Sequence, residues 1–201
     1  MITDKDTNKK GRVGIYVHVP FCLSKCHYCD FCSVRADGER RQAYVDALCR
    51  EIGFIADKIR ESGERIPIAD TVYFGGGTPS LLTGAQFSAI LEAIGQNFGI
   101  AEGAEISAEV NPKTADREKL CLMRGAGINR LSIGMQSTHD GELKKLGRIH
   151  TFADFKAIFL AAREAGFDNI SADLMYGIPD QSKESFAQSV RTLAAMNPEH
   201  I

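Results

Sequence analysis

The segment GIYVHVPFCLSKCHYC, residues 14–29, places a strand-like run directly before three closely spaced cysteines. Its first seven residues are rich in β-branched and aromatic side chains, which predicts a β-strand ending at Pro20. Cys22, Cys26 and Cys29 then fall on a loop that follows this strand. In parallel α/β folds, the chemistry-bearing side chains gather on loops at the C-terminal ends of strands. The segment therefore predicts a parallel α/β fold with a functional loop after the first strand.

The order of strand and then helix repeats along the rest of the chain. Further strands are expected at residues 71–74, 105–110, 129–136 and 169–177. At least one helical stretch follows each of them, and the fourth strand is followed by two. Five βα units in strict alternation imply a parallel sheet with helices packed outside it.

Two parallel architectures fit this alternation, and the placement of unusual residues separates them. Cys22, Gly75, Glu109, Gln136 and Asp173 lie at or just after the C-terminal ends of five different strands. A (β/α) barrel gathers its site in this way, whereas a doubly wound sheet concentrates its site at one crevice. We therefore expect an α/β fold that is a partial (β/α) barrel.

The final residues, NPEHI at 197–201, resemble the beginning of a sixth strand that is cut off. A core domain over residues 13–201 would then be incomplete at its C-terminus, after an N-terminal extension at 1–12. On this interpretation the chain is a fragment of a longer protein.

Helix starts and buried faces are also predicted by the pattern. Side chains expected to cap helices are Thr83 (in a capping box with Gln86), Thr114, Thr151 and Ser182. The first helix is expected at about 41–60, with Pro198 closing the last one. The apolar stripe of the first helix comprises Tyr44, Leu48, Ile52, Ile55 and Ile59.

Composition excludes several classes of protein. Among 201 residues, 24 Lys and Arg against 26 Asp and Glu give a net charge of −2, which argues against a basic nucleic-acid surface. Apolar residues make up 44%, a usual fraction for a soluble domain. No apolar run approaches the ~20 residues that span a bilayer, and the N-terminus lacks an apolar signal region. These features predict a cytoplasmic protein.

Cys22, Cys26 and Cys29 stand at spacings of four and three, so their thiolates can bind three corners of a cubic iron–sulfur cluster. The fourth iron would then be free for a ligand that is not protein. A zinc-stabilised interaction module is the alternative, although structural zinc sites usually use a second ligand pair, which is not seen here. Cys32 is expected to be a spare small residue rather than a cluster ligand. Cys49 and Cys121 are expected to be packing residues within helices.

The three cysteines and the aromatic Tyr28 resemble the C-x3-C-x2-C signature of the radical S-adenosylmethionine (SAM) superfamily. Further motifs resemble its oxygen-independent coproporphyrinogen III oxidase-like family, and within it the heme chaperone group HemW. They are FGGGTPSLL (74–82), AEVNP (108–112), GINRLSIGMQS (127–137), LGRIH (146–150) and DLMYGIPDQS (173–182). The resemblance runs from about residue 13 to residue 201.

The resemblance implies a radical SAM barrel with two cofactors. Cys22, Cys26 and Cys29 would hold a [4Fe-4S] cluster, and SAM would bind the remaining iron through its amino and carboxylate groups. Reduction of the cluster by an electron donor would then cleave the sulfonium bond and yield a 5′-deoxyadenosyl radical. Positions that match SAM contacts are Tyr16, Tyr28, Gly76, Gly77, Thr78, Glu109, Gln136, Arg148 and Asp173.

Simple chemistry supports these roles and also offers alternatives. The glycine run at 75–77 lets a backbone approach a ligand or adopt positive φ. Glu109 and Asp173 are acids among apolar strand residues, and buried acids need partners. A ligand would supply them, or an internal salt bridge with Arg130 would. Arg148 would pair with a carboxylate or lie solvated on the surface.

The choice of function within the family depends on few residues. Oxidases of the family resemble C-x3-C-x2-C-x-C, and Phe31 stands where the fourth cysteine would be. The pattern favours a heme chaperone that binds heme and delivers it to acceptor proteins. Oxidative decarboxylation of coproporphyrinogen III in porphyrin biosynthesis is the alternative. The heme-binding signature of the chaperones lies in a C-terminal region that this sequence does not reach, so no histidine is assigned to heme.

Overall fold

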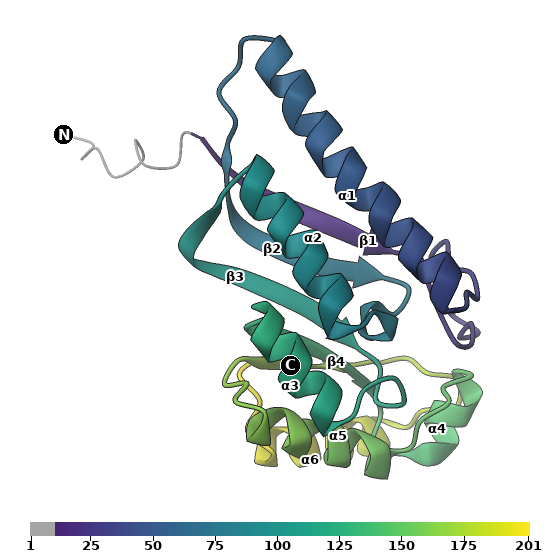
Figure 1. Cartoon of the computed structure of the whole chain (residues 1–201). Coiled ribbons are helices and arrows are strands. Elements are labelled where there is room, and N and C mark those ends of the chain that lie inside the picture. The colour runs from purple at the N-terminus through teal and green to yellow at the C-terminus, as the bar shows by residue number, and fades with distance from the viewer. Residues whose placement is uncertain (1–10) are drawn as a thin grey trace, which may run out of the picture.

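The computed structural model describes residues 11–201, and residues 1–10 lie outside the described part. Five parallel strands form one sheet (Figure 1). They are β1 (Arg12–Val19), β2 (Ile68–Gly76), β3 (Ile100–Val110), β4 (Arg130–Gln136) and β5 (Ile170–Leu174). Most of the extension expected at residues 1–12 therefore cannot be compared with the structure, and Arg12 already begins β1.

Helices connect successive strands. They are α1 (Gly38–Glu61), α2 (Gly84–Asn97), α3 (Arg117–Ala126), α4 (Asp140–Lys145), α5 (Phe152–Glu164) and α6 (Lys183–Ala195), with a short 3-10 turn η1 (Pro79–Leu81) before α2. As expected, two helices, α4 and α5, separate β4 from β5. Within the described residues, no helix combines the length and the apolar character needed to cross a bilayer.

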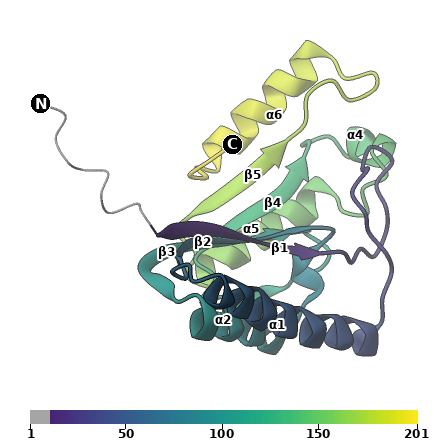
Figure 2. The ribbon, with the colours of Figure 1, turned by 90° about the horizontal axis from the view of Figure 1, so that it is seen from above.

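The strands lie side by side in their sequence order, β1-β2-β3-β4-β5. A doubly wound sheet would reverse direction at a switch point, whereas a barrel adds each strand beside the previous one. The partial (β/α) barrel is therefore confirmed, and Figure 2 shows the strands succeeding one another with α1 and α2 against one side of the sheet. Beyond β5, His200 forms an isolated parallel bridge with Ser171. This bridge lies where a sixth strand was expected to begin.

The two faces of the sheet differ in chemistry. One row across all five strands consists of buried apolar side chains that pack under the helices, namely Val17, Phe74, Ala108, Leu131 and Ile170. Burial of side chains of this kind stabilises the fold by roughly 1.5–3 kcal/mol for each large one. The adjacent row faces the other way and is polar or aromatic, namely Tyr16, Tyr73, Ser107 and Arg130. A polar inner face is therefore built into the alternation of the strands.

Three of the four expected helix caps are confirmed. Thr83 and Thr151 each form a capping box, and Ser182 accepts from the backbone N–H of Ser185. Thr114 is not a cap. Its hydroxyl donates to the carbonyl of Asn111 over 2.9 Å and stabilises the turn after β3.

Asp116 caps α3 instead, because the helix begins only at Arg117. Its carboxylate accepts from the backbone N–H of Lys119 over 2.8 Å. At the other end of the chain, α6 stops at Ala195, and Asn197 takes a positive φ before Pro198 is reached.

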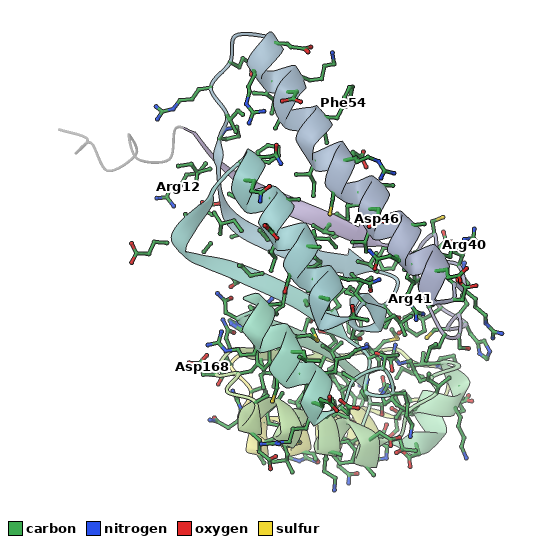
Figure 3. All side chains as sticks on the ribbon, in the orientation of Figure 1. Arg12, Arg40, Arg41, Asp46, Phe54 and Asp168 are labelled. Carbon is green, nitrogen blue, oxygen red and sulfur yellow. The ribbon has the colours of Figure 1, made fainter. Side chains whose placement is uncertain are left out.

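The buried face of α1 differs from the expected stripe. Val45, Ile52 and Ala56 are buried, whereas Ile55 is 44% exposed. The expected stripe included only large side chains and omitted Ala56, whose small side chain is fully buried. Phe54 is also exposed and points outward from α1 (Figure 3).

Candidate functional site

The cysteines lie on a closed loop at the C-terminal end of β1. Backbone hydrogen bonds join its two ends, from Cys22 N to Val34 O over 3.1 Å and from Val34 N to Pro20 O over 2.8 Å. We call residues 22–33 the cysteine loop. Because its ends are paired, the loop projects as one unit over the C-terminal edge of the sheet.

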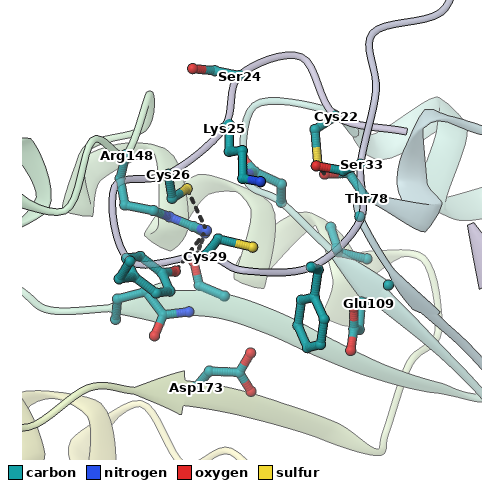
Figure 4. Close-up of a pocket in the computed structure, with 18 of the residues that line it drawn as sticks. Cys22, Ser24, Lys25, Cys26, Cys29, Ser33, Thr78, Glu109, Arg148 and Asp173 are labelled. Carbon is teal, nitrogen blue, oxygen red and sulfur yellow. Dashed lines mark hydrogen bonds between the residues drawn. The ribbon is translucent and has the colours of Figure 1, made fainter. Parts of the chain in front are cut away.

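A cavity of about 280 Å³ lies beneath this loop. Every residue predicted for the site lines it except Tyr16. These lining residues are Cys22, Cys26, Cys29, Tyr28, Gly76, Gly77, Thr78, Glu109, Gln136, Arg148 and Asp173. The structure therefore brings together side chains from the ends of all five strands and from the turn before α5, as Figure 4 shows for several of them.

Two of the cysteine sulfurs receive hydrogen bonds from cavity residues. Thr78 Oγ1 donates to Cys22 Sγ over 3.5 Å, and Arg148 Nη1 reaches Cys26 Sγ over 3.8 Å (Figure 4). Hydrogen bonds to the cysteine sulfurs are a usual part of the surroundings of iron–sulfur clusters and tune their reduction potentials.

These residues also meet the chemical needs of an iron–sulfur cluster with a bound anion. In the described part of the chain, no three His, Cys, Asp or Glu side chains lie close enough together to hold a single metal ion. A cluster differs from a single ion because each cysteine binds a separate iron. The buried Arg148 Nε has no hydrogen-bond partner, so this cavity residue keeps a donor for an anionic group. The donor set thus fits the cofactor pair of a radical SAM protein.

Arg148 is not solvated on the surface, which was one of the two expectations for it. Its guanidinium donates to the carbonyl of Gly134 over 2.8 Å and reaches the Tyr28 hydroxyl over 3.4 Å. The charge is therefore fixed on the cavity wall, where a carboxylate can meet it.

Glu109 has no salt bridge with Arg130, which instead lies 3.9 Å from Glu105. Its carboxylate accepts from the Tyr73 hydroxyl over 2.9 Å. Burial raises the pKa of Glu109, and the bond from Tyr73 opposes that rise. The backbone N–H of Gly76 also lowers this pKa, so the half-buried acid has two neutral donors and keeps acceptor capacity for a ligand.

Asp173 also has a neutral partner, since Ser132 Oγ donates to it over 2.8 Å. Gln136 lies at the end of β4 with a φ of 69°, and its carbonyl accepts from Met175 N over 2.9 Å. This backbone turn therefore fixes the position of Gln136, and its hydrogen bond joins the end of β4 to the residue after β5.

The three glycines after β2 serve packing as much as ligand approach. A Cβ on Gly75 would lie 2.8 Å from the Tyr73 ring and 2.9 Å from the Tyr16 ring. On Gly76, which has a φ of 111°, it would meet the His18 ring at 2.6 Å. A Cβ on Gly77 would lie 2.6 Å from the carbonyl oxygen of Phe21. The glycines let the first two strands and the cysteine loop approach one another.

Tyr16 lies apart from the cavity lining. It is 57% exposed on the inner face, where its ring stacks with Tyr73 and its hydroxyl contacts His18 Nδ1 over 3.1 Å. Its assignment as a SAM contact remains a prediction.

The cavity also includes residues that the sequence reasoning missed. Among them are Ser24, Lys25, Ser33, Asn111, Ser132 and Gly134. Ser132 and Gly134 were open to prediction, because they share the inner face of β4 at a period of two. The others lie on loops, whose paths no periodicity describes.

The remaining cysteines have mixed outcomes. Cys49 packs against the core and its thiol reaches the carbonyl of Ala89 over 3.7 Å, as expected of a packing residue. Cys121 is exposed on α3, so the expectation that it packs inside is wrong. Cys32 is exposed and does not line the cavity.

Sequence comparison finds heme chaperones among the curated relatives of this chain. The chain is 37% identical over 186 residues to the heme chaperone HemW of Bacillus subtilis, which covers 92% of this chain and 48% of the relative. It is 36% identical over 190 residues to HemW of Escherichia coli. This match covers 94% of this chain and 49% of the relative. The chain therefore spans about half the length of the curated relatives it matches.

Structure comparison agrees with this relationship. Coproporphyrinogen III oxidase (HemN) from Escherichia coli, a radical SAM enzyme, superposes with a TM-score of 0.81 at 33% identity, covering 92% of this chain and 42% of that one. Methylornithine synthase (PylB) shares the fold alone, with a TM-score of 0.56 at 17% identity. A sequence model of the radical SAM superfamily matches residues 16–193 of this chain. Over nearly all of its described length, this HemW-like chain belongs to the radical SAM superfamily.

Proposed function

We propose that this chain binds a [4Fe-4S] cluster and SAM, and that the protein to which it belongs binds heme and delivers it to acceptor proteins. The observation that carries the proposal is the convergence of three cysteines, two acids and one arginine on a single cavity. The similarity to HemW chaperones supports the heme role.

Each residue has a role that its position allows. Cys22, Cys26 and Cys29 would each bind one iron and leave the fourth for SAM. When bound, the two cofactors supply reductive cleavage of a carbon–sulfur bond. Arg148 would hold the SAM carboxylate, because its guanidinium is fixed on the cavity wall.

Glu109 and Asp173 would accept hydrogen bonds from the amine or the ribose hydroxyls of SAM. Their partners are neutral donors, and each carboxylate has spare acceptor capacity. The glycine turn would let the adenosyl group approach the backbone, as its missing side chains permit.

Glu109→Ala tests the SAM site. Loss of a hydrogen bond to a charged group typically costs ~1.5–3 kcal/mol, so SAM affinity should fall roughly ten- to a hundredfold. Calorimetric titration of the reconstituted protein measures this. Glu105→Ala is the matched control, since Glu105 lies on the same face of β3 and does not line the cavity. Equal affinities in wild type and Glu109→Ala would remove Glu109 from the site.

Oxidation of coproporphyrinogen III is the second candidate, favoured by the similarity to HemN. Phe31 argues against it, because the oxidase pattern has a cysteine at this position. Two assays on the full-length protein discriminate the functions, namely hemin titration followed by absorbance and turnover of coproporphyrinogen III with SAM and a reductant. Heme binding without decarboxylation supports the chaperone role, and decarboxylation supports the oxidase.

A further inference from the structure

Residues 145–148, which comprise the last residue of α4 and the turn after it, contact the middle of the cysteine loop. In both Figure 1 and Figure 2 the loop lies beside α4. Cys26 and Tyr28 are reached by the Arg148 guanidinium, over 3.8 Å and 3.4 Å. His27, between them, contacts the backbone of the turn. Three consecutive loop residues therefore meet one short segment that lies about 120 positions later.

His27 completes the hydrogen bonding of the C-terminal end of α4. The last carbonyls of a helix lack partners within the helix. Here the backbone N–H groups of Gly147 and Arg148 donate to the carbonyls of Lys144 and Leu143. The carbonyls of Lys145 and Leu146 then need donors from outside the helix.

The backbone N–H of His27 donates to Leu146 O over 3.0 Å, and its Nδ1 lies 3.1 Å from Lys145 O. A carbonyl only accepts, so Nδ1 carries the proton. The loop thus supplies both of the donors that this helix end needs.

Gly147 is required at this contact for two reasons. Its φ is 71°, in the left-handed region that favours glycine. In addition, a Cβ here would lie 3.0–3.1 Å from three atoms of the His27 ring. A side chain at 147 would therefore push the ring away from the turn.

The turn is anchored to the rest of the protein independently of the cysteine loop. Lys145 Nζ donates to Asp180 Oδ2 over 2.8 Å and to Pro179 O over 3.2 Å, after β5. Arg148 Nη2 donates to Gly134 O on β4. A support with its own anchors can hold the loop in place before any cofactor binds.

We infer that His27 and the 145–148 turn form a latch that positions Cys26 and Cys29, and that this latch sets how long the protein retains its cluster. His27 and Gly147 are positioning residues that act through the loop. The inference rests on the proposed function, because it assumes that the loop holds a [4Fe-4S] cluster.

The test compares cluster loss in reconstituted wild type, Gly147→Ala and His27→Ala. An excess of iron chelator is added anaerobically, and the decay of absorbance near ~400 nm is followed. Each variant should lose the cluster roughly five- to tenfold faster, the effect of losing one or two hydrogen bonds. Gly141→Ala is the matched control in α4, since a Cβ there meets nothing within 4 Å, and its rate should equal that of wild type.

The double variant tests whether the two residues act through one contact. If they do, His27→Ala with Gly147→Ala should accelerate loss by less than the product of the single effects. Folded single variants that retain the cluster as long as wild type would overturn the inference. If Gly147→Ala does not fold, His27→Ala alone decides it. A wild type that takes up no cluster would contradict the proposed function and this inference with it.

Discussion

At the scale of single residues, Tyr73 controls the charge of Glu109. Burial raises the pKa of Glu109, and the hydroxyl of Tyr73 partly counters this by donating to the ionised form. Tyr73 itself is held neutral, because burial and the nearby Glu109 raise its pKa. The Tyr73 hydroxyl therefore stays a donor, and its hydrogen bond favours the ionised form of Glu109 against the effect of burial.

Tyr73→Phe should shift the pH dependence of SAM binding. Removal of the donor raises the pKa of Glu109 further, so the carboxylate is protonated at a higher pH and affinity is lost earlier as pH falls. Titrations between about pH 5 and pH 8 measure the midpoint of this loss. Tyr44→Phe is the control, because its hydroxyl donates to the carbonyl of His18 and Tyr44 does not line the cavity. The same midpoint in wild type and Tyr73→Phe would refute the coupling.

His150, in the turn before α5, should make stability depend on pH. It is buried, its Nε2 contacts Met135 O over 3.2 Å, and burial followed by the charge of Arg148 lowers its pKa from 6.5 to about 4. The unfolded chain then binds a proton below about pH 6.5 that the folded chain binds only near pH 4. The free energy of unfolding should therefore fall as pH drops through this window, by up to about 3 kcal/mol.

Urea denaturation of the protein without its cluster measures this dependence. His150→Gln keeps a donor for Met135 O but cannot titrate, so its stability should change less between pH 6.5 and pH 4. The difference between the two proteins isolates His150 from the other histidines. Parallel pH profiles would show that His150 is not the responsible group.

Positions at strand ends predicted that Cys22, Glu109, Gln136 and Asp173 would meet, since strand ends in a parallel sheet lie at one edge. The resemblance to the radical SAM family supplied the other candidates, namely Tyr28, Gly76, Gly77, Thr78 and Arg148. The partners of those residues were not predictable in the same way. Tyr73 and Glu109 lie on neighbouring strands, and their contact depends on the register of β2 against β3. That register is set by an irregularity between Ala69 and Thr71, where β3 takes extra residues. Gly103, with a φ of 73°, lies among these extra residues, and a glycine within a strand indicates a bulge without giving the register.

At the scale of elements, helix α2 packs closely on α3 through a glycine. A Cβ on Gly84 would lie 2.7 Å from the Cβ of Leu122, whereas one on Gly95, in the same helix, would meet nothing within 4 Å. The two glycines therefore form a matched pair for one test of packing.

Gly84→Ala should lower the free energy of unfolding by about 1–3 kcal/mol, because the helices must separate. Gly95→Ala should raise it by up to about 1 kcal/mol, because alanine favours the helix. Thermal or urea unfolding of the two variants beside wild type gives both values. Destabilisation of equal size in both would contradict the close packing at Gly84.

Element type was easier to predict than element ends. The capping boxes at Thr83 and Thr151 were visible because both partners lie three residues apart in sequence. Thr114 and Asp116 were equally good candidates on type alone, and the turn after β3 decided between them by using the Thr114 hydroxyl. The face of α1 was misjudged at Ile55 because contact with the core, rather than side-chain size, determines which residues are buried.

At the scale of the whole molecule, the site depends on every βα unit. The cavity takes residues from the loop after β1 and from the ends of β2, β3, β4 and β5. The strand order that was expected from the positions of these residues is the order that the sheet has. A cofactor held there would contact the loop after β1 and the ends of the other four strands, and should stabilise the folded state by mass action.

The proposed site as a whole requires that Cys22, Cys26 and Cys29 hold a [4Fe-4S] cluster whose fourth iron binds SAM. Anaerobic reconstitution with iron and sulfide counting, joined to electron paramagnetic resonance of the reduced protein with and without SAM, tests it most directly. Wild type and Cys32→Ser should hold a full four-iron cluster whose signal changes when SAM is added. Alanine at any of the three ligand positions should abolish that cluster. A Cys29→Ala protein that keeps four irons and four sulfides, or a wild-type signal that SAM leaves unchanged, would contradict the account.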